Sequence, residues 1–180
     1  MTTRTNLSVR AKLAVRAMAI TLLGAFYASA QGAPPATPIT LLYSRGLQQV
    51  IAQERGKIVV LSLWATWCAP CLRELPMLVD IEKSLAANGV RLIGVAMDEP
   101  ADLTSRVIPF RNKYFPALRS YASHEPEMDT LVSVVDPAWN EILPTTYIIG
   151  RNGKLLHKIQ GTRSAAEFRA VISAALTESR

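Results

Sequence analysis

The stretch WATWCAPCLRE, residues 64–74, carries both cysteines of the 180-residue chain and two of its three tryptophans. A short apolar run precedes the cysteines, KIVVLSLWA at residues 57–65, and its β-branched residues are typical of a strand buried on both faces of a sheet. The segment that follows, LRELPMLVDIEKSLAANG, repeats apolar residues at helical spacing and ends on Gly89. We therefore expect the cysteines where a buried strand passes into a helix.

This position favours redox chemistry. Unpaired backbone N–H groups and the helix dipole stabilise negative charge at a helix N-terminus, so the pKa of the Cys68 thiol is expected below the usual value of about 8.5. Cys71 lies one turn further along the same helix face. We expect Cys68 to be the exposed nucleophile that attacks a disulfide, and Cys71 the more enclosed thiol that resolves the mixed disulfide.

Two other uses of the cysteine pair fit less well. A structural disulfide usually closes a long loop, and a bridge between Cys68 and Cys71 closes almost none. A peroxidase nucleophile is preceded by Thr or Ser at three residues, whereas Thr66 is two residues before Cys68.

A metal site lacks ligands. Zinc needs further side chains, and the sequence has no other cysteine. His157 is expected in a hairpin and His124 in a loop, each isolated. Met128 lies close to His124 in the sequence, so a copper(I) chaperone that binds through Cys68 and Cys71 stays open as an alternative. No metal is expected in the leading interpretation.

The N-terminus has the pattern of an export signal. Residues 1–30 contain four basic residues and no acid, and the apolar run at residues 17–30 closes on Ala-Ser-Ala. This predicts a signal peptide cleaved near Ala30, with an uncleaved N-terminal anchor as the alternative. Residues 31–38, QGAPPATP, are expected to form a linker. The single domain then spans residues 39–180 and is periplasmic, or anchored to the inner membrane and facing the periplasm.

The composition excludes some partners. The formal net charge of +6 falls to about +2 once residues 1–30 are set aside, so the domain lacks the basic surface that nucleic-acid binding requires. Hydrophobic residues make up 49% and charged residues 19%, which fits one globular domain.

The rest of the chain predicts an α/β fold. Residues 57–97 have the order strand, helix, strand, which is typical of a βαβ unit with parallel strands. Asn152-Gly153 is a turn signal between two strands of a β-hairpin. A final helix is expected from Ser164, where Glu167 completes a capping box, to Leu176. The other elements expected are a helix at residues 44–54, a helix at residues 101–113 disturbed by Pro109, a strand at residues 116–122 and a short helix at residues 127–135.

Two segments carry a family resemblance. WCAPC after a hydrophobic strand resembles the active site of the thioredoxin superfamily. LSLWATWCAPCLRELP together with LPTTYIIGRNGK resembles the exported TlpA/ResA-like thiol–disulfide oxidoreductases, from Lys57 to the C-terminus. The resemblance implies a thioredoxin-like fold with a central mixed sheet flanked by helices. It also implies an enzyme that needs no cofactor beyond the redox-active disulfide.

The same resemblance implies a substrate site. Pro144 matches the cis-proline of the family, which packs against the cysteines and leaves the preceding backbone free. An extended client segment would then add as a strand at Leu143, Pro144 and Thr145. Trp67 is expected to flank the thiol on the surface and contact the client. Trp139 is expected to cover the cis-proline loop or simply to pack, and Trp64 to lie in the core.

A proton acceptor is implied as well. Glu74 matches an acid that this branch carries three residues after the second cysteine, where it would accept the proton of Cys71. The alternative is an exposed carboxylate that favours the helix dipole. Cytosolic thioredoxins carry a buried Asp at the position of Ser62, so that route is absent here.

The residues between the cysteines bear on the direction of electron flow. Strong oxidants have a His before the second cysteine, whereas this chain has Ala69-Pro70, and Pro70 has no N–H with which to stabilise a thiolate. The pair is therefore expected to reduce disulfides of exported proteins, such as apocytochromes c or copper-site proteins. A membrane thiol carrier would supply the electrons. A docking protein without catalysis is a further alternative.

Overall fold

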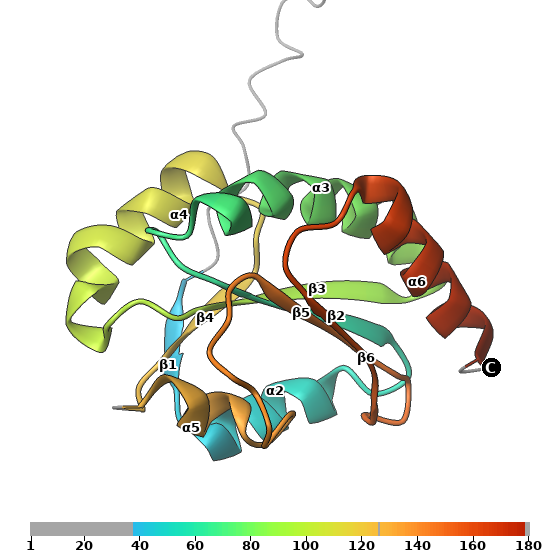
Figure 1. Ribbon diagram of the computed structural model, residues 1–180, viewed down its shortest axis with the longest axis horizontal. Coiled ribbons are helices and arrows are strands. Elements are labelled where there is room, and N and C mark those ends of the chain that lie inside the picture. Colours follow the sequence, from blue (N-terminus) through green and yellow to red (C-terminus); the bar gives the residue numbers. More distant parts are fainter. Residues whose placement is uncertain (1–37, 126, 179–180) are drawn as a thin grey trace, which may run out of the picture. The chain divides into compact units, whose positions relative to one another are not determined.

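The computed structural model describes residues 38–125 and 127–178, so the expected signal peptide and nearly all of the expected linker lie outside the described residues. A six-stranded sheet lies between two layers of helices (Figure 1). The strands are β1 Thr40–Leu42, β2 Ile58–Trp64, β3 Val90–Ala96, β4 Ser120–Ser123, β5 Thr145–Ile149 and β6 Leu155–Gln160. The α-helices are α2 Ser44–Gln53, α3 Ala69–Leu85, α4 Ile108–Tyr114, α5 Met128–Val132 and α6 Ala165–Glu178.

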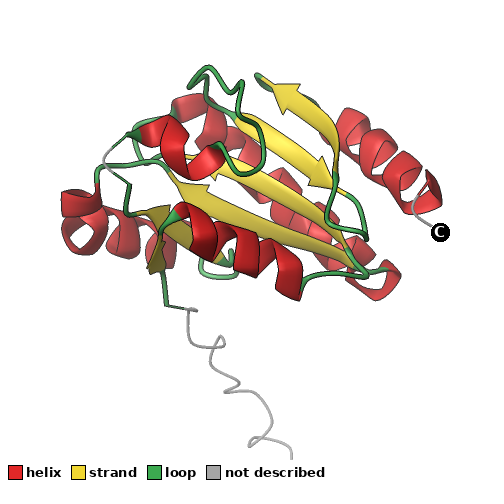
Figure 2. Ribbon diagram, turned by 90° about the horizontal axis from the view of Figure 1, so that it is seen from below, coloured by secondary structure: helices red, strands yellow, loops and turns green. Residues whose placement is uncertain are grey.

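The sheet has the order β1-β4-β3-β2-β5-β6. The first four strands of this order are parallel, and β5 and β6 are antiparallel to their neighbours. Both the βαβ unit and the C-terminal hairpin are therefore confirmed. Figure 1 shows α3, α4 and α6 on one face of the sheet and α2 and α5 on the other, and Figure 2 views the sheet from the side of α2 and α5.

Every residue of β2 is buried because helices cover both faces of the sheet. Ile58, Val60 and Trp64 belong to the core cluster that includes residues of α3 and α6. Val59, Leu61 and Leu63 belong to the cluster on the side of α2 and α5. This alternation fixes which face each residue of β2 presents, and it directs the end of the strand into the loop that carries the cysteines.

The segment between β3 and β4 differs from its prediction. One helix was expected at residues 101–113, but a 3-10 turn at Pro100–Asp102 is followed by a π-helical turn at Leu103–Val107 and then by α4. Pro109 lies in the first turn of α4 and has no N–H to donate to the π-helical turn before it. Val107 and Ile108 both have αR backbone angles, so the helical segment is continuous, and the expected disturbance at Pro109 is seen as the π-helical turn.

Several smaller predictions can be compared with the structure. β1 was not predicted, and the strand expected from residue 116 begins only at Ser120. The final helix extends past Leu176 to Glu178. Its capping box is confirmed, because the backbone N–H and hydroxyl of Ser164 donate to Glu167 Oε2 at 2.8 and 2.7 Å. The turn between β5 and β6 has Gly153 at a φ of 81°, which suits glycine.

Candidate active site

The two cysteines form a disulfide at the N-terminus of α3, with an S–S distance of 2.02 Å. Cys68 is the N-cap residue, and the backbone N–H of Cys71 donates to its Sγ at 3.3 Å. Ala69 and Pro70 form the first turn between them, where the proline needs no N–H. The helix terminus therefore directs one backbone donor at the sulfur of Cys68.

The expected difference in exposure between the cysteines is small. Cys68 is 5% exposed and Cys71 is 1% exposed. The order agrees with the expectation, but the prediction that Cys68 is an exposed nucleophile is wrong for this oxidised form. The disulfide directs its sulfur toward Cys71, and both cysteines pack into the core cluster with Ala65 and Leu75.

The two tryptophans of the motif have opposite environments. Trp67, directly before Cys68, is 58% exposed and stands at the surface. Trp64 is fully buried, and its indole N–H donates to Ser120 Oγ at 3.1 Å. Trp64 thus packs in the core at the end of β2, as predicted. Trp67 exposes a large apolar side chain directly before Cys68.

The peptide bond between Leu143 and Pro144 is cis, as the resemblance implied. Thr145 pairs with Leu63 of β2, so Pro144 lies next to the end of β2, where the loop to the cysteines begins. The carbonyl oxygen of Pro144 accepts from the backbone N–H of Gly161 at 2.9 Å. Leu143 is only half-buried.

Thr145 has a different place from the one expected. Its side chain is fully buried on the face opposite α3, so it is not available for side-chain contact with a client. Its hydroxyl donates to the carbonyl of Ile142 at 2.6 Å and accepts from the indole N–H of Trp139 at 3.2 Å. Trp139 therefore supports the cis-proline loop, and Thr145 holds it from beneath.

Glu74 is buried at the same site. It is 2% exposed, on the α3 stripe that also contains Cys71, Leu75 and Leu78. Its Oε1 accepts from the hydroxyl of Thr146 at 3.1 Å, and its Oε2 is buried without a partner in hydrogen-bonding geometry. The alternative of an exposed carboxylate is therefore wrong.

Burial decides the protonation of Glu74. Removal from water raises the pKa of Glu74 from 4.5 to about 7, against the opposing effects of the Thr146 hydroxyl and of the backbone N–H and charge of Arg163. A carboxyl with this pKa takes up and releases protons near neutral pH. Ser62, at the position of the buried Asp of cytosolic thioredoxins, pairs with Thr146 across β2 and β5. The Glu74 carboxyl therefore comes from α3 to a place beside the strand residue that carries the acid in those proteins.

Asp98 was not expected at the site. It lies two residues after the end of β3 and is 4% exposed. Its carboxylate accepts from the backbone N–H of Thr66 at 3.0 and 3.2 Å and also from the Thr66 hydroxyl. The sequence does contain a signal for this residue, because an acid just beyond the end of β3 lies at the same sheet edge as the residues that follow β2.

The two histidines, which were expected to be isolated, each contact a residue other than a cysteine. The ring of His124 stacks on Tyr43 with centroids 4.6 Å apart, and Nε2 of His157 lies 4.0 Å from Glu178 Oε2. Within residues 38–125 and 127–178, no group of three or more His, Cys, Asp or Glu is placed to hold a metal ion. No helix in those ranges is long and apolar enough to cross a bilayer.

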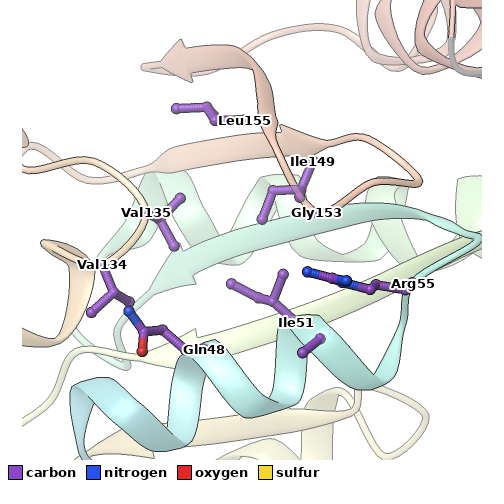
Figure 3. Close-up of a pocket in the computed structure, with 9 residues that line it drawn as sticks. Gln48, Ile51, Arg55, Val134, Val135, Ile149, Gly153 and Leu155 are labelled. Carbon is purple, nitrogen blue, oxygen red and sulfur yellow. The ribbon is translucent and has the colours of Figure 1, made fainter.

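A cavity of about 200 Å³ lies between α2 and the β5–β6 hairpin, away from the disulfide (Figure 3). Figure 3 shows Ile51, Val135 and Ile149 around it and the side chain of Arg55 along one side. None of the nine described residues that line it is Cys, His, Asp or Glu, so it offers no thiol or proton chemistry. The lining residues are Gln48, Ile51, Ala52, Arg55, Val134, Val135, Ile149, Gly153 and Leu155.

Comparisons with known proteins agree with this geometry. Residues 35–158 match the model of the AhpC/TSA family. The chain is 28% identical over 124 residues to the thiol-disulfide oxidoreductase ResA of Geobacillus thermodenitrificans, which covers 69% of this chain and 66% of that protein. It is 28% identical over 119 residues to ResA of Bacillus subtilis, which covers 66% and 62%. The chain thus spans slightly under two thirds of these relatives.

A solved structure is also similar. A thiol:disulfide interchange protein, thioredoxin family protein, from Chlorobium tepidum TLS superposes with a TM-score of 0.60 at 25% identity, over 82% of this chain and 99% of that one. The six-stranded sheet with its helices is therefore a thioredoxin-like fold.

Proposed function

Since the chain belongs to the AhpC/TSA family, we propose that it is a thiol–disulfide oxidoreductase that reduces disulfides of exported proteins. The observation that carries the proposal is the Cys68–Cys71 disulfide at the start of α3, together with the cis peptide bond before Pro144 beside the end of β2. The names of the similar proteins support the same reaction class.

The first half-reaction uses Cys68. In the reduced protein its thiolate attacks one sulfur of a client disulfide, which forms a mixed disulfide and releases the other client sulfur as a thiolate. The N-terminus of α3 favours the attacking thiolate, because the backbone N–H of Cys71 already points at this sulfur. The client thiolate leaves with the electron pair of the broken bond.

The second half-reaction uses Cys71 and Glu74. Glu74 accepts the proton of the Cys71 thiol, and the resulting thiolate attacks the sulfur of Cys68 and releases the second client thiolate. Glu74 lies one helical turn from Cys71 and is buried with it. A pKa of about 7 lets its carboxylate take a proton from a thiol and return it to solvent or to the client. The protein ends in the disulfide form seen here.

The client segment is proposed to bind at the cis-proline. Leu143 is half-buried and precedes Pro144, which supports pairing of its backbone with an extended client chain. Trp67, directly before Cys68, adds an exposed apolar surface, and Ile142 is 47% exposed. In this proposal Thr145 supports the loop through its contacts with Trp139 and Ile142 and does not touch the client.

The proposed direction is reduction. Pro70 cannot donate a backbone hydrogen bond to a thiolate, and Ala69 has no polar side chain, so the reduced form gains less stability than in oxidants with His at the second position. We propose the periplasm as the location, from the export signal at residues 1–30, with an anchored form as the alternative. Apocytochromes c or copper-site proteins are the proposed clients, and a membrane thiol carrier the proposed electron donor.

An insulin-reduction assay with dithiothreitol tests the proposal. The wild-type protein is expected to accelerate reduction, Cys68→Ser to abolish it, and Cys71→Ser to accumulate a mixed disulfide with its substrate. A copper(I) titration of the reduced protein tests the competing chaperone. Tight stoichiometric copper binding that depends on His124 or Met128, without disulfide turnover, would replace the proposed enzyme.

A further inference from the structure

The loop before Cys68 is tied to the end of β3. The backbone N–H of Met97 donates to the carbonyl of Trp64 at 2.8 Å, which continues the pairing of β2 and β3 beyond both strands. The carboxylate of Asp98 then accepts hydrogen bonds from both the backbone N–H and the hydroxyl of Thr66. Thr66 is two residues before Cys68, so the carboxylate of Asp98 is held directly beside the active-site loop.

The carboxylate of Asp98 is buried without a cation. It is 4% exposed, and none of the ion pairs found within residues 38–125 and 127–178 includes it. A charge with little water around it acts on its neighbours more strongly than a surface charge does. Thr66, the residue that Asp98 holds, lies two residues before Cys68, whose sulfur becomes a thiolate during the reaction.

We propose that Asp98 is a positioning residue that fixes the loop before Cys68 and whose negative charge makes the Cys68–Cys71 pair a stronger reductant. The inference deepens the proposed function and rests on it. Reduction of the disulfide takes two electrons and one proton, and it yields the thiolate of Cys68 and the thiol of Cys71. The nearby carboxylate disfavours this thiolate, so it destabilises the reduced form and leaves the disulfide unchanged.

This electrostatic effect has a signature that a structural role lacks. Where Cys68 is a neutral thiol, the charge of Asp98 has almost no effect on the redox equilibrium. Where Cys68 is a thiolate, the charge of Asp98 has its full effect on the redox equilibrium. The difference in redox equilibrium between the wild-type protein and a variant without the charge must therefore grow with pH. Glu74 on α3 also titrates in this range, beside the positive charge of Arg163. Glu99 and Glu125 line the same hollow as Asp98. These groups are the same in the wild-type protein and in the Asp98 variants, so their effects cancel in that comparison.

The experiment measures the equilibrium of the Cys68–Cys71 disulfide with glutathione between pH 6 and pH 10. Asp98→Asn removes the charge and keeps an oxygen that can accept from Thr66. Glu99→Gln is the matched control, because Glu99 is the exposed neighbour and makes the same change of charge without contacting Thr66. Thr66→Val removes one donor to Asp98 and keeps the charge. Asp98→Ser is a second neutral variant, and circular dichroism establishes that each variant is folded.

At the low-pH end, we expect Asp98→Asn and the wild-type protein to have the same equilibrium constant with glutathione. At pH values where Cys68 is ionised, the disulfide of Asp98→Asn should be about tenfold less stable than that of the wild-type protein, or about 30 mV less reducing. Glu99→Gln and Thr66→Val should follow the wild-type curve. Wild-type and neutral Asp98 variants with the same pH dependence would overturn the inference and leave the proposed function standing. A wild-type protein without disulfide turnover would instead overturn the proposed function.

Discussion

The hydroxyl of Thr146 donates a hydrogen bond to Glu74 Oε1 at 3.1 Å, and it joins the strand that follows the cis-proline to the helix that carries both cysteines. The partners are 72 residues apart in the sequence. Ser62 lies beside Thr146 in the sheet. The buried carboxyl at this place is therefore that of Glu74 on α3, because Ser62 on β2 has only a hydroxyl.

Glu74→Gln is expected to slow disulfide exchange at the step that uses Cys71. The amide fills the same space but does not accept a proton at neutral pH, so the Cys71 thiol loses its base. Turnover should fall by about a hundredfold, at the lower end of the range typical of a lost general base. The pH dependence should also lose the ionisation near 7 that belongs to Glu74. Stopped-flow mixing with a small disulfide substrate measures both, and an unchanged pH profile would leave Glu74 with no role in proton transfer.

The same variant makes a prediction about stability. The pKa of Glu74 is raised on folding, from 4.5 to about 7, so the folded protein holds its proton more tightly than the unfolded chain does. This contribution to the free energy of unfolding is fully present below pH 4.5 and is lost as the pH rises through 7. The loss should be on the order of 3 kcal/mol in the wild-type protein and absent in Glu74→Gln. Urea unfolding of the oxidised proteins at several pH values measures it, and parallel curves would contradict the assigned pKa.

Thr146→Val should raise the pKa of Glu74 further. The hydroxyl of Thr146 stabilises the ionised carboxylate, and valine has the same shape without a donor. The ionisation seen in the pH profile should therefore move upward by about one pH unit, since a hydrogen bond to a charged group contributes about 1.5 kcal/mol or more. Thr177→Val on the exposed end of α6 is the control and should leave the profile in place. A profile that shifts downward would show that the hydroxyl does not stabilise the carboxylate.

The two tryptophans of the motif should separate stability from client binding. Trp67→Ala removes a side chain that is 58% exposed, so it should change the free energy of unfolding by less than about 1 kcal/mol while slowing exchange with protein substrates. Trp64→Ala empties a buried site and should cost about 3–5 kcal/mol. Thermal unfolding and insulin reduction, measured side by side, test the pair. Equal losses of stability in both variants would contradict the assignment.

Much of the fold follows from patterns that are local in the sequence. The buried runs of β2 and β3, the helical spacing of α3 and the turn at Asn152-Gly153 predict the βαβ unit and the hairpin. β1 has three residues, which is too few for a period to show, and its place depends on pairing with β4. The π-helical turn before α4 adjoins Pro109, where the sequence predicts a disturbed helix.

The candidate site divides in the same way. Cys68, Cys71 and Pro144 are marked by their own motifs. The burial of Glu74 depends on the register of α3, and the apolar stripe through Cys71, Leu75 and Leu78 contains the signal for it. Thr145 points away from α3 because side chains alternate along β5, which the sequence alone does not orient. The contact of Asp98 with Thr66 joins the ends of two strands and needs the folded sheet.

The measurement that tests the proposed function most directly is the reduction potential of the Cys68–Cys71 pair, determined by equilibrium with glutathione or dithiothreitol at pH 7. A protein that reduces exported clients should lie near the roughly −270 mV of thioredoxin. A potential near the roughly −120 mV of strong disulfide oxidants would contradict the proposed direction of electron flow.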